Sequence, residues 1–297
     1  MKILLLFISI TISSISTADY SNHEDSKEVI DELVNVHGFE ESFVIKVLKN
    51  AKKRNEMLVS VANPAEKTKT WDEYKAIFLE KKRIANGKKF IKENIKTLER
   101  AEKEFGVPKE VITAILGVET RYGRIMGRYR VIDSLATLGF DDPRRSKFFR
   151  SELIQFFLLT RENNLDIFET KGSYAGAMGY GQFISSSYRA YAIDYDGDQY
   201  ADLFNSVDDA IGSIANYLKI HGWKRDGNIV TEVYPNNVRK FYKPHESLTR
   251  FLPLSFNENG KELHFIADDN FYAIARYNIS DVYAMAVYYL SEEFKKI

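Results

Sequence analysis

The stretch Ala114-Ile-Leu-Gly-Val-Glu-Thr-Arg-Tyr-Gly123 decides how this chain is organised, because it places a carboxyl group on the apolar face of a helix. Val107-Pro108 predicts a helix start just before it, since the fixed φ of proline suits the first helical position. The side chains that then recur at helical spacing are Val111, Ile112, Ile115 and Glu119. Glu119 therefore continues the apolar stripe, where a hydrophobic residue is expected.

A carboxyl group in that position is a candidate proton donor. Removal from water penalises its charged form, and the negative end of the helix dipole acts in the same direction, so both raise the pKa of Glu119. Such a group holds its proton near neutral pH and can give it to a leaving group. The alternative is a structural glutamate paired with Arg121 or Arg124, and the helix alone does not decide between them.

The N-terminus has the pattern of a secretory signal. Met1-Lys2 is followed by a short apolar run, and Ser16-Thr17-Ala18 precedes a rise in polarity. We expect residues 1–18 to be a signal peptide, cleaved after Ala18, and the mature protein to be soluble in the periplasm. The chain has no cysteine, which excludes a lipid-modified cysteine anchor, disulfides and thiolate metal sites.

Composition excludes some classes of partner. Of the 297 residues, 44% are hydrophobic and 13% aromatic, and Lys plus Arg equals Asp plus Glu at 42 each. This balance argues against a nucleic-acid binder or a basic membrane-surface protein. The 18 tyrosines suit sugar-binding surfaces, although many will be core.

The pattern divides the mature chain into four parts. Residues 19–106 read as an N-terminal helical domain, 107–223 as the core, 224–269 as a small mixed module with short strands, and 270–297 as a helical segment returning to the core. Within the first part, Thr70 is expected to cap one helix, Asn86-Gly87 to end another, and Gly106 to close the last. In the mixed module, strands are expected within 227–233, 240–242 and 263–267.

The stretch Lys171-Gly-Ser-Tyr-Ala-Gly-Ala-Met-Gly-Tyr-Gly-Gln-Phe183 is the glycine-richest part of the chain. Its glycines let backbone approach a ligand closely, and Ser173, Tyr174, Tyr180 and Gln182 offer hydrogen bonds and stacking faces. It has neither the spacing of a phosphate loop nor the frame of a serine-hydrolase elbow. We interpret it as a polar cleft wall, with a surface loop as the alternative.

A carboxylate-rich loop follows at 194–209. Asp194, Asp196, Asp198 and Asp202 occupy loop positions 1, 3, 5 and 9, and Tyr200 at position 7 would lend its carbonyl. This spacing suits a hard divalent cation such as Ca²⁺. Unlike a standard EF-hand loop, it has glycine at position 4 and no glutamate at position 12. The five histidines show no paired ligand spacing, so no catalytic metal is expected.

Several motifs in series resemble the lytic murein transglycosylase B family, from about Trp71 to the C-terminus. They are Gly117-Val-Glu-Thr-Arg-Tyr-Gly123, the glycine-rich stretch ending at Phe183, the Asp194 loop, Ala210 to Tyr217 with His221-Gly-Trp223, and Arg276-Tyr-Asn278 with Tyr283-Ala-Met-Ala. The resemblance implies a mainly α fold: a lysozyme-like helical core, an N-terminal helical domain and a small α/β insertion near the C-terminus.

The resemblance also implies roles for residues. Glu119 would be the sole catalytic carboxyl group, with Ser173 and Gln182 beside it at the bond being cleaved. Tyr74, Tyr217, Tyr277, Asn278 and Tyr283 match cleft positions that hold the glycan or support the acid. Calcium would be held by Asp194, Asp196, Asp198 and the Tyr200 carbonyl, with Asp209 or alternatively Asp208 as the last ligand. Tyr122, Phe148 and Ile184-Ser185 depart from the family pattern.

The implied reaction is cleavage of the β-1,4 bond between N-acetylmuramic acid and N-acetylglucosamine in peptidoglycan strands, which leaves 1,6-anhydro ends. No organic cofactor is implied, and the ion would be structural. Two alternatives stay open: a hydrolytic muramidase with Asp133 or Asp141 as second carboxylate, and a non-catalytic peptidoglycan-binding scaffold.

Overall fold

The computed structural model describes residues 19–234 and 252–296. The predicted signal peptide and the strand expected at 240–242 lie outside them. The fold is mainly helical, as predicted. The helices are η1 (Tyr20–Asn22), α1 (Ser26–Asp31), the π-helical turn η2 (Glu32–Val36), α2 (Glu41–Asn50), α3 (Asn55–Ala62), α4 (Ala65–Thr68), α5 (Trp71–Phe78), α6 (Lys81–Glu93), α7 (Ile95–Phe105), α8 (Lys109–Thr120), α9 (Val131–Asp141), α10 (Ser146–Glu162), α11 (Ser185–Tyr191), α12 (Val207–Ile220), α14 (Asp269–Tyr277) and α15 (Asp281–Lys295). The strands are β1 (Tyr129–Arg130), β2 (Lys171–Gly172), β3 (Val230–Val233), β4 (Leu252–Glu258) and β5 (Lys261–Ala267).

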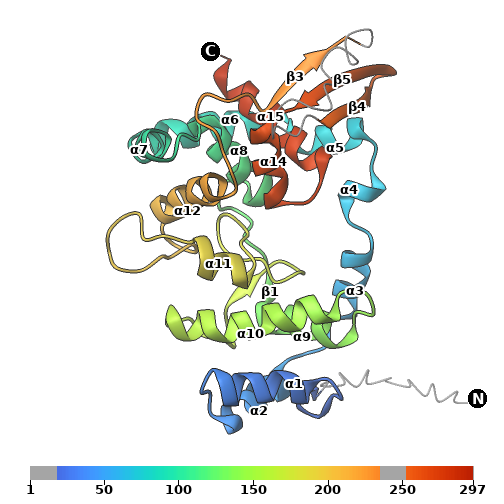
Figure 1. Ribbon diagram of the computed structural model, residues 1–297, viewed down its shortest axis with the longest axis vertical. Helices are drawn as coiled ribbons and strands as arrows, with labels where there is room; N and C mark the ends of the chain where they lie inside the picture. The colour runs from blue at the N-terminus through green and yellow to red at the C-terminus, as the bar shows by residue number, and fades with distance from the viewer. Residues whose placement is uncertain (1–18, 235–251, 297) are drawn as a thin grey trace, which may run out of the picture.

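The elements form two groups joined by a long connection (Figure 1). Helices α1, α2, α9 and α10 lie at one end, while α5 to α8, α12, α14 and α15 lie toward the other. The connection runs through α3 and α4 along one side of the molecule. We call residues 51–70 the connecting segment. One continuous cluster of buried side chains extends through both groups.

Helix α8 is the central element of the larger group. It packs against α15, α6, α7 and α12, so nearly all its side chains from Val111 to Thr120 are buried. Pro108 is the N-cap and not the first helical residue, so the helix begins one residue later than predicted. Arg121 ends the helix in the left-handed conformation at φ 53°. Since four helices cover α8, Glu119 in its last turn is half-buried among their side chains.

The prediction that Asn86-Gly87 ends a helix is wrong, because both residues lie inside α6. A Cβ at Gly87 would lie 2.4 Å from the Phe294 ring and 2.6 Å from the Tyr122 hydroxyl. The glycine is needed for close packing with α15 and with the turn after α8, and tertiary contacts outweigh its weak helix propensity. The other two expectations are confirmed: Thr70 caps α5 in a capping box with Glu73, and Gly106 ends α7 at φ 75°.

Two small antiparallel sheets complete the fold. Strands β1 and β2 pair Tyr129 with Gly172. The second sheet has the order β3-β5-β4, and its β4–β5 hairpin, in which β4 was not predicted, packs on α5. Trp71 and Lys75 of α5 both donate to the Glu258 carboxylate, at 3.1 and 2.7 Å. The described part of the mixed module is thereby fastened to the helix that carries Tyr74.

Within residues 19–234 and 252–296, none of the helices combines the length and the apolar character that a membrane span requires.

Buried Asp133 of α9 fastens the connecting segment to the smaller group of helices. Its side chain is 1% exposed and pairs with Arg130 at 2.5 Å and Arg54 at 3.4 Å, and it accepts a hydrogen bond from the Lys52 N–H at 2.8 Å. Nearby Asp141 accepts from the Tyr20 hydroxyl and from Lys53. These carboxylates, proposed above as possible second acids, are therefore occupied in joining helices.

Replacing Asp133 with asparagine should lower the free energy of unfolding by about 2 kcal/mol, because the buried side chain loses the charge that strengthens its contacts with Arg130 and Arg54. Urea denaturation followed by circular dichroism measures this. The exposed Asp31→Asn change on α1 is the control and should shift stability by less than about 0.5 kcal/mol. Equal stabilities for the two variants would contradict a structural role for Asp133.

Candidate active site

Glu119 lies in the last turn of α8 and is half-buried. The Tyr283 hydroxyl, from α15, donates a hydrogen bond of 2.6 Å to its Oε1. Burial raises the pKa of Glu119 to about 7, the Tyr283 hydrogen bond opposes this rise, and the charge of Glu66 adds to it. The carboxyl group therefore exchanges its proton near neutral pH, as a general acid and base must.

The competing interpretation of Glu119 as a structural ion pair is not what the structure shows. Arg121 pairs with Glu80, at 2.9 Å, and the ion pairs of the described residues include none with Glu119. Instead, Tyr283 donates to it directly, and burial together with the charge of Glu119 raises the pKa of Tyr74, Tyr277 and Tyr283, which come from three different helices. Those hydroxyls stay protonated and act as hydrogen-bond donors.

Glu66 is a second carboxylate at the site, and the sequence analysis missed it. It lies on α4, a single helical turn in the connecting segment. Its Oε1 accepts hydrogen bonds from the Tyr74 hydroxyl and from Asn278 Nδ2, both at 3.3 Å. The sequence around Glu66 does not mark it as a site residue. It lies beside the exposed lysines Lys67 and Lys69, so its pattern is that of a solvent-exposed residue.

The glycine-rich stretch folds as a loop against the C-terminal end of α8. Thr120, next to Glu119, donates its hydroxyl to the Tyr180 carbonyl at 2.8 Å. Gln182 adopts φ 50°, and its Nε2 donates to the carbonyls of Met126 and Gly179 at 3.1 and 3.0 Å. Its side-chain oxygen remains as the acceptor available to a ligand.

Ser173 stands at the start of the same loop. Its Oγ accepts from the N–H groups of Ala175 and Ala177 at 3.3 and 3.0 Å. Two backbone donors therefore fix the oxygen, and the hydroxyl hydrogen can be offered to an incoming acceptor. The backbone thus fixes the polar groups of this loop, and its role as the wall of a cleft stays a prediction.

Tyr277 and Tyr217 support this loop from behind. Tyr277 donates to the Gly181 carbonyl at 2.6 Å, and Tyr217 donates to the Arg276 carbonyl at 2.7 Å. Their rings meet Phe183 and one another, with centroids 4.8 to 5.8 Å apart. Because both hydroxyls already donate to backbone, these tyrosines hold the loop in place for other groups to contact a ligand.

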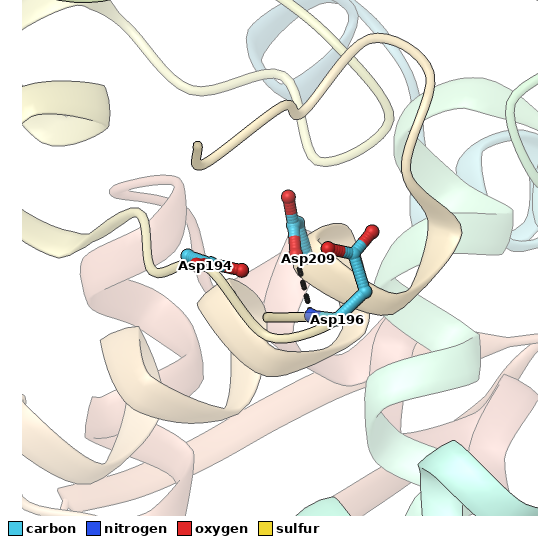
Figure 2. A group of neighbouring side chains, drawn as sticks. All are labelled: Asp194, Asp196 and Asp209. Carbon is cyan, nitrogen blue, oxygen red and sulfur yellow. Dashed lines mark hydrogen bonds between the residues drawn. The ribbon is translucent and has the colours of Figure 1, made fainter. Parts of the chain in front are cut away.

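Three carboxylates gather at the acidic loop before α12 (Figure 2). Oxygens of Asp194, Asp196 and Asp209 lie within 4.8 Å of one another. Asp209 is buried and accepts from the N–H groups of Tyr195, Asp196 and Asp202, at 2.6, 3.1 and 2.8 Å. Like charges this close repel unless a cation lies among them, and an all-oxygen donor set suits Ca²⁺.

The structure distinguishes the two candidates for the last ligand. Asp209 belongs to the cluster, whereas Asp208 accepts a hydrogen bond from Thr97 of α7. Asp198 is not part of the three-carboxylate cluster, and its Oδ1 accepts from the Tyr200 N–H at 2.9 Å. The geometry therefore favours Asp209 and leaves Asp198 as a nearby ligand candidate on the exposed side of the loop.

The chain is similar to known proteins over most of its length. Residues 21–292 match the family model described as transglycosylase SLT domain. The chain is 37% identical over 302 residues to membrane-bound lytic murein transglycosylase B of Escherichia coli K12, and the match covers 92% of this chain and 83% of that protein.

Solved structures of relatives include complexes with ligands. Lytic transglycosylase Slt35 of E. coli, solved in complex with calcium, has a TM-score of 0.83 and 36% identity and covers 93% of this chain and 94% of its own. SltB3 of Pseudomonas aeruginosa, solved in complex with NAG-NAM-pentapeptide, has a TM-score of 0.79 and 26% identity. The match covers 92% of this chain and 80% of the SltB3 chain.

Glu119→Gln should be more stable than the wild type at pH 8 and about equally stable at pH 4.5. The folded-state pKa of about 7 lies above the ordinary glutamate value of 4.5, so the folded state binds the proton more tightly. The free energy of unfolding of the wild type therefore falls as pH rises from 4.5 to about 7, because the folded protein must give up this proton. We expect a difference of about 2 kcal/mol, less than the full shift gives because the group is partly exposed.

Urea denaturation at both pH values measures this difference. Equal stability at pH 8 would contradict the burial of an acidic carboxyl group at this position.

Proposed function

This chain belongs to the transglycosylase SLT domain family and is a lytic transglycosylase of peptidoglycan with a mainly helical, lysozyme-like fold, and from this premise we propose that Glu119 performs both proton transfers of the reaction. The observation that carries the proposal is the buried Glu119 carboxyl group, hydrogen-bonded to Tyr283, with a pKa near 7. Such a group is protonated often enough to donate and weak enough as an acid to take the proton back.

In the first step, Glu119 donates its proton to the glycosidic oxygen between N-acetylmuramic acid and N-acetylglucosamine. The bond from that oxygen to C1 breaks, and positive charge develops at C1 and the ring oxygen. The N-acetylglucosamine side leaves with a free 4-hydroxyl. The acetamido group of the muramoyl unit lies next to C1 and stabilises its charge.

In the second step, the 6-hydroxyl of the same muramoyl unit attacks C1. The Glu119 carboxylate takes the hydroxyl proton as the new bond forms, which restores the neutral acid. The product is a 1,6-anhydro end, and no water is consumed. The Tyr283 hydroxyl supports the carboxylate between the two steps by donating to it.

The remaining cleft residues have proposed positioning roles. Ser173 and Gln182 offer a hydroxyl hydrogen and an amide oxygen to the sugar nearest the broken bond. Tyr74 and Asn278 face the glycan beside Glu66, while Tyr217 and Tyr277 act through the loop that they support. The peptidoglycan fragment bound in the SltB3 relative is consistent with this choice of ligand.

A hydrolytic muramidase is the second candidate, and it requires a carboxylate that activates water. Asp133 and Asp141, the candidates named from the sequence, are paired with Arg130 and Lys53 respectively. Those contacts give both residues a structural role and favour the transglycosylase reaction. The two reactions differ in their products by one water.

We further propose that the acidic loop holds a structural Ca²⁺ ion through Asp194, Asp196 and Asp209, with Asp198 and the Tyr200 carbonyl completing the site. The clustered oxygens and the calcium complex of Slt35 support this assignment. The ion would neutralise the cluster and stabilise the loop that leads into α12. A signal peptide at 1–18 would send the enzyme to the periplasm, where its murein substrate lies.

Glu119→Gln should lower cleavage of purified murein sacculi by at least about 1,000-fold, because glutamine keeps the shape but cannot transfer the proton. The assay is release of soluble muropeptides, with product masses read by mass spectrometry. Wild-type products should carry anhydro ends, about one water lighter than those of a muramidase. Binding to sacculi should persist in the variant. Full activity in the variant, or reducing ends in the wild-type products, would overturn the proposed mechanism.

Calcium should raise the melting temperature by about 5 °C at saturating concentration, because the ion binds the folded state only. Asp209→Asn should abolish this response, and Asp208→Asn, the matched control, should keep it. Differential scanning calorimetry in calcium and in chelator measures the effect. A melting curve that is unchanged by chelator would exclude the site.

A further inference from the structure

Glu66 is the one carboxylate outside α8 whose charge raises the pKa of Glu119, within residues 19–234 and 252–296. It comes from the connecting segment, far from α8 in sequence, and it is half-buried. Its Oε1 receives the Tyr74 hydroxyl and Asn278 Nδ2, both at 3.3 Å. A single carboxylate oxygen thereby joins α4, α5 and the end of α14 around the site.

The hydrogen-bond partners of Glu66 depend on it as their acceptor. The Tyr74 side chain is 1% exposed, and a buried tyrosine hydroxyl without an acceptor is costly. Asn278 follows α14 directly, next to Tyr277, which holds the glycine-rich loop. Glu66 therefore determines where two of the proposed glycan contacts point.

The charge of Glu66 also reaches across the site. Burial is the main cause of the raised pKa of Tyr74 on α5, Tyr174 in the glycine-rich loop and Glu119 on α8, and the charge of Glu66 adds to it in each case. In the part of the chain that the structure describes, the other titratable groups that act on or bind Glu119 are the hydroxyls of Tyr283, Tyr277 and Tyr74, which stay neutral. The nearby cations are engaged elsewhere, since Arg121 pairs with Glu80 and Arg83 donates to the Gly117 carbonyl.

We propose that Glu66 is a positioning residue of the lytic reaction, whose Oε1 holds Tyr74 and Asn278 toward the glycan and whose negative charge lies close enough to act on Glu119. The inference rests on the proposed role of Glu119 as the acid. Glu66 is assigned a positioning role through Oε1, which accepts both hydrogen bonds, and activation of water by its other oxygen is an outcome of the test below. The reaction would keep its anhydro product when Glu66 is changed.

Two substitutions separate the two parts of this role. Glu66→Gln keeps an acceptor oxygen for Tyr74 and Asn278 but removes the charge. Glu66→Ala removes both. The control is Glu56→Gln on α3, which removes a negative charge from an exposed position of the same connecting segment.

The first measurement is a ¹³C NMR titration of the Glu119 carboxyl group, identified by the resonance that disappears in Glu119→Gln. In Glu66→Gln the midpoint should fall by about half a unit, and in Glu56→Gln it should not move. This readout requires no activity. A midpoint that does not move in Glu66→Gln would overturn the proposed charge effect.

The second measurement is the pH profile of anhydro-muropeptide release. Glu66→Gln should lose about threefold in rate at pH 8, where less Glu119 is protonated, and less than about twofold at pH 5.5. Glu66→Ala should also raise KM at both pH values, because Tyr74 and Asn278 lose their acceptor. A loss in Glu66→Gln that is equal at both pH values would reduce Glu66 to a structural contact and overturn the proposal.

The two proposals fail in distinguishable ways. If Glu119→Gln keeps full activity, the role of Glu119 as the acid is wrong, yet the NMR midpoint still tests the charge effect of Glu66. If Glu119→Gln is inactive while the midpoint in Glu66→Gln is unchanged, the acid assignment stands and the role of Glu66 is wrong. Reducing ends released by wild type but not by Glu66→Gln would assign Glu66 as a water-activating base and overturn its positioning role.

Discussion

The hydrogen bond between Tyr283 and Glu119 is the contact on which the site depends. It joins α15, near the C-terminus, to the central helix α8, and it places a hydroxyl donor 2.6 Å from a carboxyl oxygen that the fold has largely removed from water. Burial and this bond act in opposite directions on the pKa of Glu119. Their balance leaves the group near neutrality, where it can both lose and regain a proton.

Close packing around α8 makes that burial possible. The Tyr122 hydroxyl lies between α6 and α8, where a Cβ at Gly87 or Gly117 would approach it to 2.6 or 2.7 Å. It donates to the Arg83 carbonyl at 2.8 Å, and Arg83 in turn donates to the Gly117 carbonyl at 3.0 Å. Similarly, Gly181 leaves room for the Tyr277 hydroxyl, which a Cβ would meet at 2.7 Å. Glycines thus let tyrosine hydroxyls reach backbone carbonyls near the acid.

Two of the buried carboxylates, Asp133 and Asp209, illustrate a different use of the same chemical group. Each accepts backbone N–H groups and organises the chain around it. Asp133 is paired with arginines, whereas Asp209 stands beside two other aspartates. Among residues 19–234 and 252–296, Glu119 has neither an arginine partner nor a backbone donor, so its environment favours the neutral acid. The groups around a carboxylate, more than the extent of its burial, therefore distinguish the structural carboxylates Asp133 and Asp209 from Glu119.

The sequence by itself determined the local features, because they depend on neighbours along the chain. The spacing of Val111, Ile112, Ile115 and Glu119 predicted the helix and the buried acid, and Thr70 and Gly106 marked helix ends by their own backbone chemistry. The alternating aspartates pointed to the acidic loop. The motifs in series also identified the family and hence the reaction.

Only the tertiary structure decided which distant groups meet. Gly87 was read as a helix end because its packing partner, Phe294, lies in another helix. Asp209 and Asp208 are adjacent in sequence, and only the fold turns one into the cluster and the other toward Thr97. Glu66 looked like a solvated residue until the connecting segment placed it beside Tyr74 and Asn278. Such contacts arise from long-range packing, which local periodicity does not encode.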